Sequence, residues 1–160
     1  MVTVVGKVKI LDVCCGSRMF WYNKHEPHTT YCDIRQEKKD LPSGHHINVN
    51  PDVVADFRSL PFADCTFDNV VFDPPHLLHA GPKSWLRAKY GVLDPKVWKD
   101  ELKQGFDECQ RVLKPTGTLI FKWNDDQIPF SKIIEVFGQK PIYGDRRGKT
   151  RWVVFIKKGK

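Results

Sequence analysis

Four aspartates recur along this chain directly after short apolar runs. They are Asp12, Asp33, Asp56 and Asp73. A carboxylate accepts hydrogen bonds from hydroxyl and amino groups, so several such acids in one place suit the binding of a polar small molecule. The last of them opens the tetrapeptide Asp73-Pro74-Pro75-His76, in which consecutive prolines restrict the backbone. The spacing of the acids carries more information than any one of them.

Short apolar runs alternate with stretches of helical period, and this alternation predicts the elements that position the acids. Five parallel strands are expected, over residues 7–15, 29–35, 53–56, 67–72 and 118–123. Three helices are expected, over residues 17–24, 95–113 and 130–137. The helix over 95–113 is the clearest because its apolar residues recur at spacings near 3.6.

This order of elements predicts an α/β fold with a Rossmann-like, doubly wound and mostly parallel sheet. A C-terminal hairpin, formed by 142–143 and 150–157 around the turn 144–149, would add an antiparallel edge. Sheets of this kind bind ligands beyond the carboxyl ends of their strands. Since the four acids lie at those ends, we expect them to meet around one site.

Length and composition favour a compact enzyme or binding module. With 160 residues, 41% of them hydrophobic, we expect a single domain over 1–160. There is no run of about 18 apolar residues and no signal-peptide pattern, which predicts a soluble, cytoplasmic protein with no membrane association. Five cysteines, an odd number, indicate a reducing compartment. No metal site is expected, because the cysteines and histidines over 14–32 lack paired Cys-x-x-Cys spacing.

The net charge of +7 is concentrated in residues 140–160, where eight cations face one acid, Asp145. The cations are Lys140, Arg146, Arg147, Lys149, Arg151, Lys157, Lys158 and Lys160. Such a cluster suits a phosphate backbone, and a lysine-rich terminus is as often a solvated tail. Both interpretations stay open from the sequence.

In its strand-end segments the sequence resembles the class I S-adenosylmethionine-dependent methyltransferases, in particular the branch that methylates amino and amide nitrogens. The resemblance covers nearly the whole chain. It rests on ILDVCCGS, CDI, ADFRSLPF, FDPPH and ECQRVLKPTGTLIF, in the family's order and spacing. It implies S-adenosylmethionine as the cofactor and an N-methyltransferase as the enzyme.

The resemblance implies a cofactor site at the first three strand ends. That site comprises Asp12, Cys14, Cys15, Gly16, Ser17, Asp33, Ile34, Asp56 and Phe57. The small-residue turn at Gly16 would approach the cofactor, and amides of the following helix would receive its carboxylate. Asp33 would bind the ribose hydroxyls, and Asp56 beside Phe57 would bind adenine. Arg18 stands where the family often has glycine, and we expect it to face the cofactor's carboxylate.

The resemblance assigns catalysis to Asp73, Pro74, Pro75 and His76, with histidine in the motif's aromatic position. A conjugated amine attacks a methyl group poorly because its lone pair is delocalised. The Asp73 carboxylate and the Pro74 carbonyl would accept hydrogen bonds from its two N–H groups and pull the nitrogen toward tetrahedral geometry. His76 would stack on the substrate or relay a proton, and His79 could take either role. By itself Asp-Pro-Pro is more often a turn.

The segment after the motif, residues 76–93, interleaves cations with aromatic rings and is expected to be a substrate loop. Candidate substrate-binding residues are Lys83, Trp85, Arg87 and, from the fifth strand, Trp123. Proteins that bind single-stranded nucleic acid neutralise phosphates and stack bases in this way. Trp85 could equally pack inward beneath a solvated helix.

Together these features predict methylation of an exocyclic amino nitrogen of a base in RNA or DNA. The base must be flipped out or already single-stranded to be reached. The chain has no room for a separate target-recognition domain, so specificity would come from the loop, the basic segment or a protein partner. Two alternatives stay open: N-methylation of a protein glutamine amide, and a catalytically silent nucleic-acid-binding relative.

Overall fold

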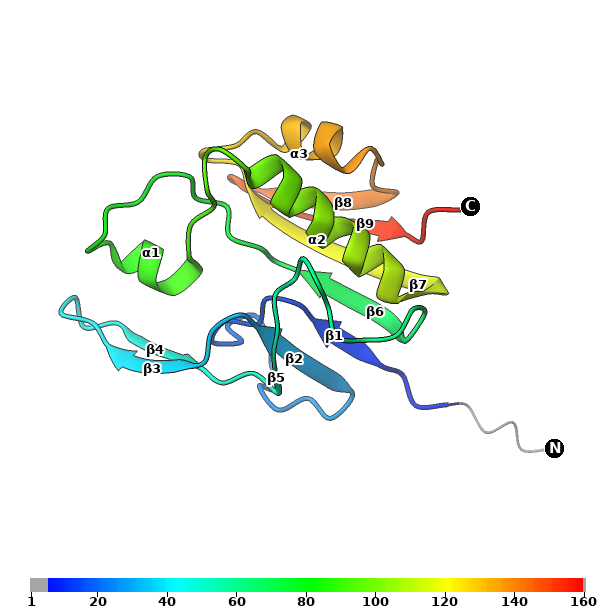
Figure 1. The fold of residues 1–160 in the computed structure, drawn as a ribbon, viewed down its shortest axis with the longest axis horizontal. Coiled ribbons are helices and arrows are strands. Elements are labelled where there is room, and N and C mark those ends of the chain that lie inside the picture. The colour runs from blue at the N-terminus through cyan, green and yellow to red at the C-terminus, as the bar shows by residue number, and fades with distance from the viewer. Residues whose placement is uncertain (1–5, 160) are drawn as a thin grey trace.

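A computed structural model describes residues 6–159, in which seven strands form one sheet. The strands are β1 (Ile10–Asp12), β2 (Thr29–Asp33), β5 (Val53–Val54), β6 (Phe67–Phe72), β7 (Leu113–Asn124), β8 (Tyr143–Arg147) and β9 (Thr150–Ile156). Their order is β5-β2-β1-β6-β7-β9-β8, parallel from β5 to β7, with β9 antiparallel to both of its neighbours (Figure 1). The predicted Rossmann-like sheet with an antiparallel C-terminal edge is confirmed.

Three helices accompany the sheet: α1 (Trp85–Tyr90), α2 (Trp98–Val112) and α3 (Phe130–Phe137). The helices predicted over 95–113 and 130–137 are confirmed as α2 and α3. Both pack on one face of the sheet, where the Phe106 and Phe137 rings stack with centroids 4.1 Å apart against Phe121 of β7 (Figure 1). None of the described helices is long and apolar enough to cross a membrane.

Strand β7 shows how the sequence divides the two faces. Leu119, Phe121 and Trp123 are at most 1% exposed and belong to the core under the helices. Side chains alternate along a strand, so Lys122 between the two aromatic residues points to the opposite face. The main core therefore lies on one side of the sheet only.

The opposite face is covered near the strand ends by residues 13–28, which form turns rather than the helix predicted over 17–24. That prediction is wrong for two physical reasons. Arg18 has a φ of 56°, in the left-handed region that interrupts a right-handed helix. The rings of Phe20 and Trp21 pack edge-on against Trp152 and Tyr31 of the sheet, which pulls the segment flat.

A separate antiparallel hairpin, β3 (Glu37–Asp40) with β4 (His46–Val49), was not predicted. Its signal in the sequence was the alternation of apolar Ile47 and Val49 with polar His46 and Asn48; the two apolar side chains are buried. Figure 1 shows this hairpin and α1 standing beyond the sheet on the side of the β6 arrowhead. Both elements therefore extend from the edge where ligands are expected.

Candidate active site

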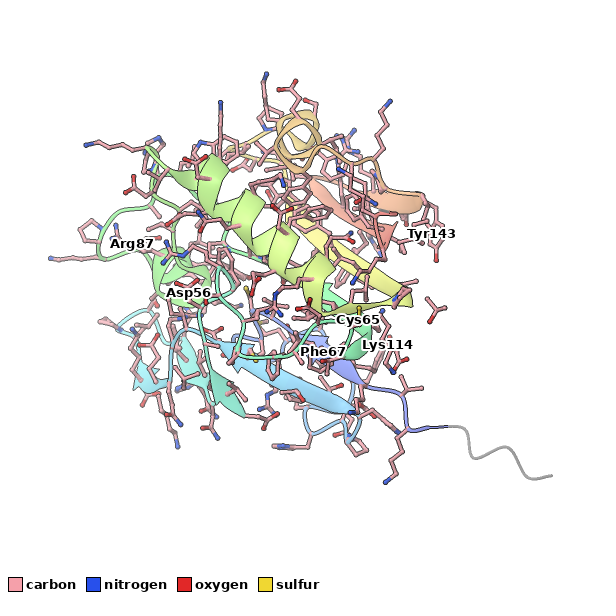
Figure 2. All side chains as sticks on the ribbon, turned by 45° about the vertical axis from the view of Figure 1, so that its right-hand side comes forward. Asp56, Cys65, Phe67, Arg87, Lys114 and Tyr143 are labelled. Carbon is pink, nitrogen blue, oxygen red and sulfur yellow. The ribbon has the colours of Figure 1, made fainter. Side chains whose placement is uncertain are left out.

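One cavity of about 710 Å³ lies at the carboxyl ends of the parallel strands, a volume typical of small-molecule sites. Its wall includes residues 13–17, 33–35 and 73–77, which lie at the carboxyl ends of β1, β2 and β6. Figure 2 shows Asp56 and Arg87 at this end of the molecule, well away from Phe67 and Lys114, where β6 and β7 begin. The strand-end clustering expected from the sequence is therefore present for most of the segments concerned.

The turn after β1 and the end of β2 are joined through Asp33. This carboxylate is 5% exposed, and its Oδ2 accepts a hydrogen bond from the Gly16 amide at 2.9 Å. Its Oδ1 accepts from the Arg35 amide at 2.9 Å and from Arg35 Nε at 3.3 Å. Gly16 has a φ of 50°, a conformation that other residues rarely adopt. The result is a preorganised acceptor on the cavity wall.

Cys14 and Cys15 line the cavity as thiols. Burial raises the pKa of Cys15 to about 12 and raises the pKa of Cys14 well above its ordinary value. Both side chains are therefore neutral at physiological pH. They are small, weakly polar wall residues beside Gly16 and Ser17.

An apolar section of the wall comes from Ile34 and Phe57. The Ile34 side chain is 61% exposed, and the Phe57 ring packs at 5.4 Å from the ring of Phe72. Asp56 does not line the cavity. Its carboxylate accepts hydrogen bonds from Arg58 Nε and Nη2, and these bonds hold the pKa of Asp56 below its usual value. The contact expected between Asp56 and adenine is thus not matched by its placement.

Asp12 is fully buried and also lies outside the cavity wall. Its Oδ2 accepts a hydrogen bond of 2.7 Å from the Trp21 indole, while its Oδ1 has no hydrogen-bond partner among residues 6–159. Burial raises the pKa of Asp12 to about 7. The Asp12 side chain, predicted to contact the cofactor, therefore anchors the loop on the sheet face.

Arg18 points away from the cavity. Its guanidinium carbon lies 3.7 Å from the centroid of the Tyr31 ring, and its nitrogens donate to the carbonyls of Lys24 and Asn50. The expectation that Arg18 faces the cofactor's carboxylate is therefore wrong. With no helix after β1, the expected helix N-terminus is absent from this end of the wall as well.

The Asp73-Pro74-Pro75-His76 segment forms the opposite wall. Burial raises the pKa of Asp73, and an ion pair between Lys122 Nζ and Asp73 Oδ2, 3.2 Å long, acts in the other direction. The His76 ring lies 5.7 Å from the ring of Tyr90. Burial, followed by the charge of Lys122, lowers the pKa of His76. This wall therefore combines the Asp73 carboxyl group, paired with Lys122, and an imidazole that is neutral at neutral pH.

Trp123, predicted to contact substrate, is 1% exposed and donates its indole N–H to the Ile128 carbonyl. The structure thus places Trp123 in the core and not on the cavity wall. The Trp123 ring meets the His76 ring edge-on at 6.2 Å, so it supports His76 from the core side. Its position inside β7, with its neighbours Lys122 and Asn124 lining the cavity, explains the difference.

In the segment predicted as a substrate loop, one face of α1 lines the cavity with Leu86, Lys89 and Tyr90. Residues three and four apart share one face of a helix, so the folding of α1 turns Trp85 and Arg87 elsewhere. Trp85 stacks on His45 with ring centroids 4.2 Å apart, and Arg87 is exposed. Lys83 is exposed ahead of α1.

Sequence reasoning missed several wall residues: Phe20, Arg35, Lys122 and Lys149. Only Lys122 had a signal in the sequence: side chains alternate along a strand, so a residue between two core residues points to the opposite face. Arg35 is notable because it also donates to the carbonyls of Ala88 and Lys89, at 2.9 and 3.2 Å. It thereby links the Asp33 end of the cavity to the last turn of α1.

Comparison with known proteins identifies the family. The family model described as "Methyltransferase domain" matches residues 11–121. The chain belongs to this methyltransferase family. A search of curated proteins gives no match. The matched range runs from β1 into β7 and so includes the Gly16 turn, Asp33 and the Asp73 segment.

Solved structures agree with this fold. The PH0226 protein of Pyrococcus horikoshii superposes with a TM-score of 0.62 at 19% identity, covering 98% of this chain and 84% of that chain. A TehB-like SAM-dependent methyltransferase of Corynebacterium glutamicum gives 0.57 at 18% identity, covering 95% and 81%. The N-methyltransferase NodS of Bradyrhizobium japonicum, in complex with S-adenosyl-L-homocysteine, gives 0.56 at 15% identity, covering 94% and 78%. This methyltransferase is of class I, and S-adenosylmethionine is its cofactor.

Proposed function

We propose that this methyltransferase acts on an exocyclic amino nitrogen of a base in RNA or DNA, presented single-stranded or flipped from a duplex. One observation carries the proposal. Asp73 and His76 lie on the wall of the same cavity as Gly16 and Asp33. The proposed acceptor for the amine, the ring proposed to stack on a planar substrate and the proposed cofactor site therefore line the same cavity.

The residues at the β1 and β2 ends suit the cofactor. The buried Asp33 carboxylate, held by Gly16 and Arg35, would accept hydrogen bonds from the ribose hydroxyls. Ile34 and Phe57 would cover the adenine ring with apolar surface. The turn with Cys14, Cys15 and Ser17 would line the methionine part. When bound, S-adenosylmethionine supplies an electrophilic methyl group.

Asp73 and Pro74 are the proposed acceptors for the two hydrogens of the target amine. Lys122 occupies Asp73 Oδ2, which leaves Oδ1 for the substrate. The prolines restrict the backbone that carries the second acceptor, so little entropy is lost on binding. His76, supported by Tyr90 and Trp123, would stack on the base.

Cations flank the cavity on two sides, which favours a polyanionic substrate over a protein amide. On one side Lys89 lines the cavity beside the exposed Arg87. On the other, Lys149 lines it beside the exposed Arg146 and Arg147 of β8. Phosphates of a strand that crosses the cavity would meet cations at both ends. Recognition of a sequence context would come from α1, this basic hairpin or a protein partner.

The test is transfer of tritiated methyl groups from S-adenosylmethionine to RNA, heat-denatured DNA, duplex DNA and a protein fraction. We expect incorporation into a single-stranded nucleic acid, and an N-methylated base after digestion to nucleosides and mass spectrometry. Incorporation into protein alone, with N-methylglutamine as the product, would overturn the proposal in favour of a glutamine-amide methyltransferase.

Two substitutions separate the proposed roles. Asp73→Asn should reduce transfer by about 100-fold or more, because the lost charge acts where positive charge develops, while cofactor affinity stays at the wild-type value in calorimetry. Asp33→Ala should mainly weaken cofactor binding. An equal loss of cofactor affinity in both variants would contradict this division.

A further inference from the structure

Lys122 lies directly beside Asp73 because of the sheet register. Phe72 of β6 pairs with Phe121 of β7. Asp73, which follows Phe72, and Lys122, which follows Phe121, are therefore neighbours. The Lys122 ammonium lies 3.2 Å from Asp73 Oδ2, and the two side chains are 28% and 23% exposed. This ion pair is therefore half-buried at the cavity wall rather than solvated at the surface.

Two aromatic rings also lie near the Lys122 ammonium. Its nitrogen lies 5.5 Å from the ring centroids of both Phe20 and Trp152, and these rings meet edge-on at 5.3 Å. A cation over aromatic faces is stabilised most where water is partly excluded. Phe20 comes from the loop after β1 and Trp152 from β9, so three separate parts of the chain determine where this one amine lies.

We propose that Lys122 is a positioning residue, which orients the Asp73 carboxylate and keeps it ionised for the reaction; the inference rests on the proposed function of Asp73. By binding one carboxylate oxygen, Lys122 leaves the other directed to the substrate. Burial alone favours the protonated form of Asp73, and a protonated carboxyl would lack the charge that attracts the amine hydrogen. The adjacent ammonium opposes that effect.

The other titratable groups around this pair are Asp12, Cys14, His76 and Asp126. Cys14 and His76 are neutral at neutral pH, since burial raises the pKa of the first and lowers the pKa of the second. Asp126 is paired with Lys149. Lys122 is thus the cation that faces Asp73 among the described residues.

The first test needs no substrate. The side-chain carboxyl carbons of aspartate are followed by ¹³C NMR during pH titration, with Asp73 assigned by its absence in Asp73→Asn. Lys122→Met keeps the length of the side chain and removes its charge, so the Asp73 midpoint should move to higher pH. Lys122→Arg should restore it. Lys103→Met, which removes a lysine paired with Asp107 on the solvent-facing side of α2, is the matched control and should leave the midpoint unchanged.

The second test measures methyl transfer to heat-denatured DNA against pH. Lys122→Met should lose about tenfold in kcat near pH 6 and regain activity at higher pH, as expected when an essential base is less ionised. Its cofactor affinity should equal the wild-type value. Lys122→Gln serves in the same way if the Met variant does not give a wild-type thermal midpoint.

The outcomes separate the two proposals. If Asp73→Asn transfers methyl groups as fast as the wild type, the proposed function of Asp73 fails. If Asp73→Asn is inactive but Asp73 titrates alike in the wild type and in Lys122→Met, only the inference about Lys122 fails. A pH-independent loss that Lys122→Arg does not rescue would also overturn it, because that result indicates packing alone.

Discussion

The two faces of the sheet differ in what covers them. On one face α2 and α3 bury a continuous aromatic cluster in which Phe106, Phe121, Phe137 and Phe155 are at most 1% exposed. On the other, near the strand ends, Phe20 and Trp21 of a turn segment lie on the sheet and stay half-buried. The helical face holds neutral, fully packed side chains, whereas the loop face holds Asp12 and Lys122. Stability and chemistry are therefore separated across the thickness of one sheet.

We expect the largest loss of stability from Phe106→Ala, at the centre of the face covered by α2 and α3. Removing a buried phenylalanine leaves a cavity and should lower the free energy of unfolding by about 3–5 kcal/mol. Urea unfolding followed by circular dichroism measures it. Phe20→Ala on the loop face is the matched control, and similar losses in both variants would contradict the division between the faces.

Gly105→Ala tests where the helical face meets the cavity. An added Cβ would lie 2.4 Å from the ring of Phe57, which lines the cavity, and 2.8 Å from Phe72. Overpacking of this kind costs about 1–3 kcal/mol, and displacement of the Phe57 ring should also weaken cofactor binding. Calorimetry and urea unfolding measure the two effects. Unchanged cofactor affinity would show that the Phe57 ring does not form part of the cofactor site.

Phe20→Ala should change stability little and activity strongly. The half-buried ring contributes about 1 kcal/mol or less to the free energy of unfolding. The ring also makes a cation–π contact with Lys122. Methyl transfer should therefore fall while the thermal midpoint stays near that of the wild type. Phe20→Leu, which keeps bulk without an aromatic face, separates packing from the cation contact. A fully active Phe20→Ala variant would show that the loop after β1 does not help to position Lys122.

The last test of the comparison is the pH dependence of stability in Asp12→Asn. The pKa of Asp12 is about 7 in the folded protein against 3.8 ordinarily, so between these values the folded state binds a proton that the unfolded chain has lost. This group therefore makes stability fall as pH rises from about 4 to 7. The Asn variant should lack that component in urea unfolding at several pH values. Parallel pH profiles for both proteins would contradict a buried, protonatable Asp12.

Much of the architecture was predictable because local patterns report on it. Helix α2 follows from apolar spacing, and the end of β6 follows from Pro74 and Pro75, which cannot join a ladder. The helix expected over 17–24 was wrong because contacts of Phe20 and Trp21 with the sheet overrode local preference. Hairpin β3–β4 went unpredicted since its short strands carry only two buried residues, Ile47 and Val49.

The amino-acid sequence by itself determined the parallel order of strands and the acids that end them, because strand period and proline act locally. Only the tertiary structure decided which acids face the cavity. Asp33 and Asp73 line it, whereas Asp12 is taken by Trp21 and Asp56 by Arg58. It also brought Lys122 to Asp73 across 49 residues of sequence. Side-chain direction at a strand end depends on partners and on register, and neither is written in the spacing of the residues.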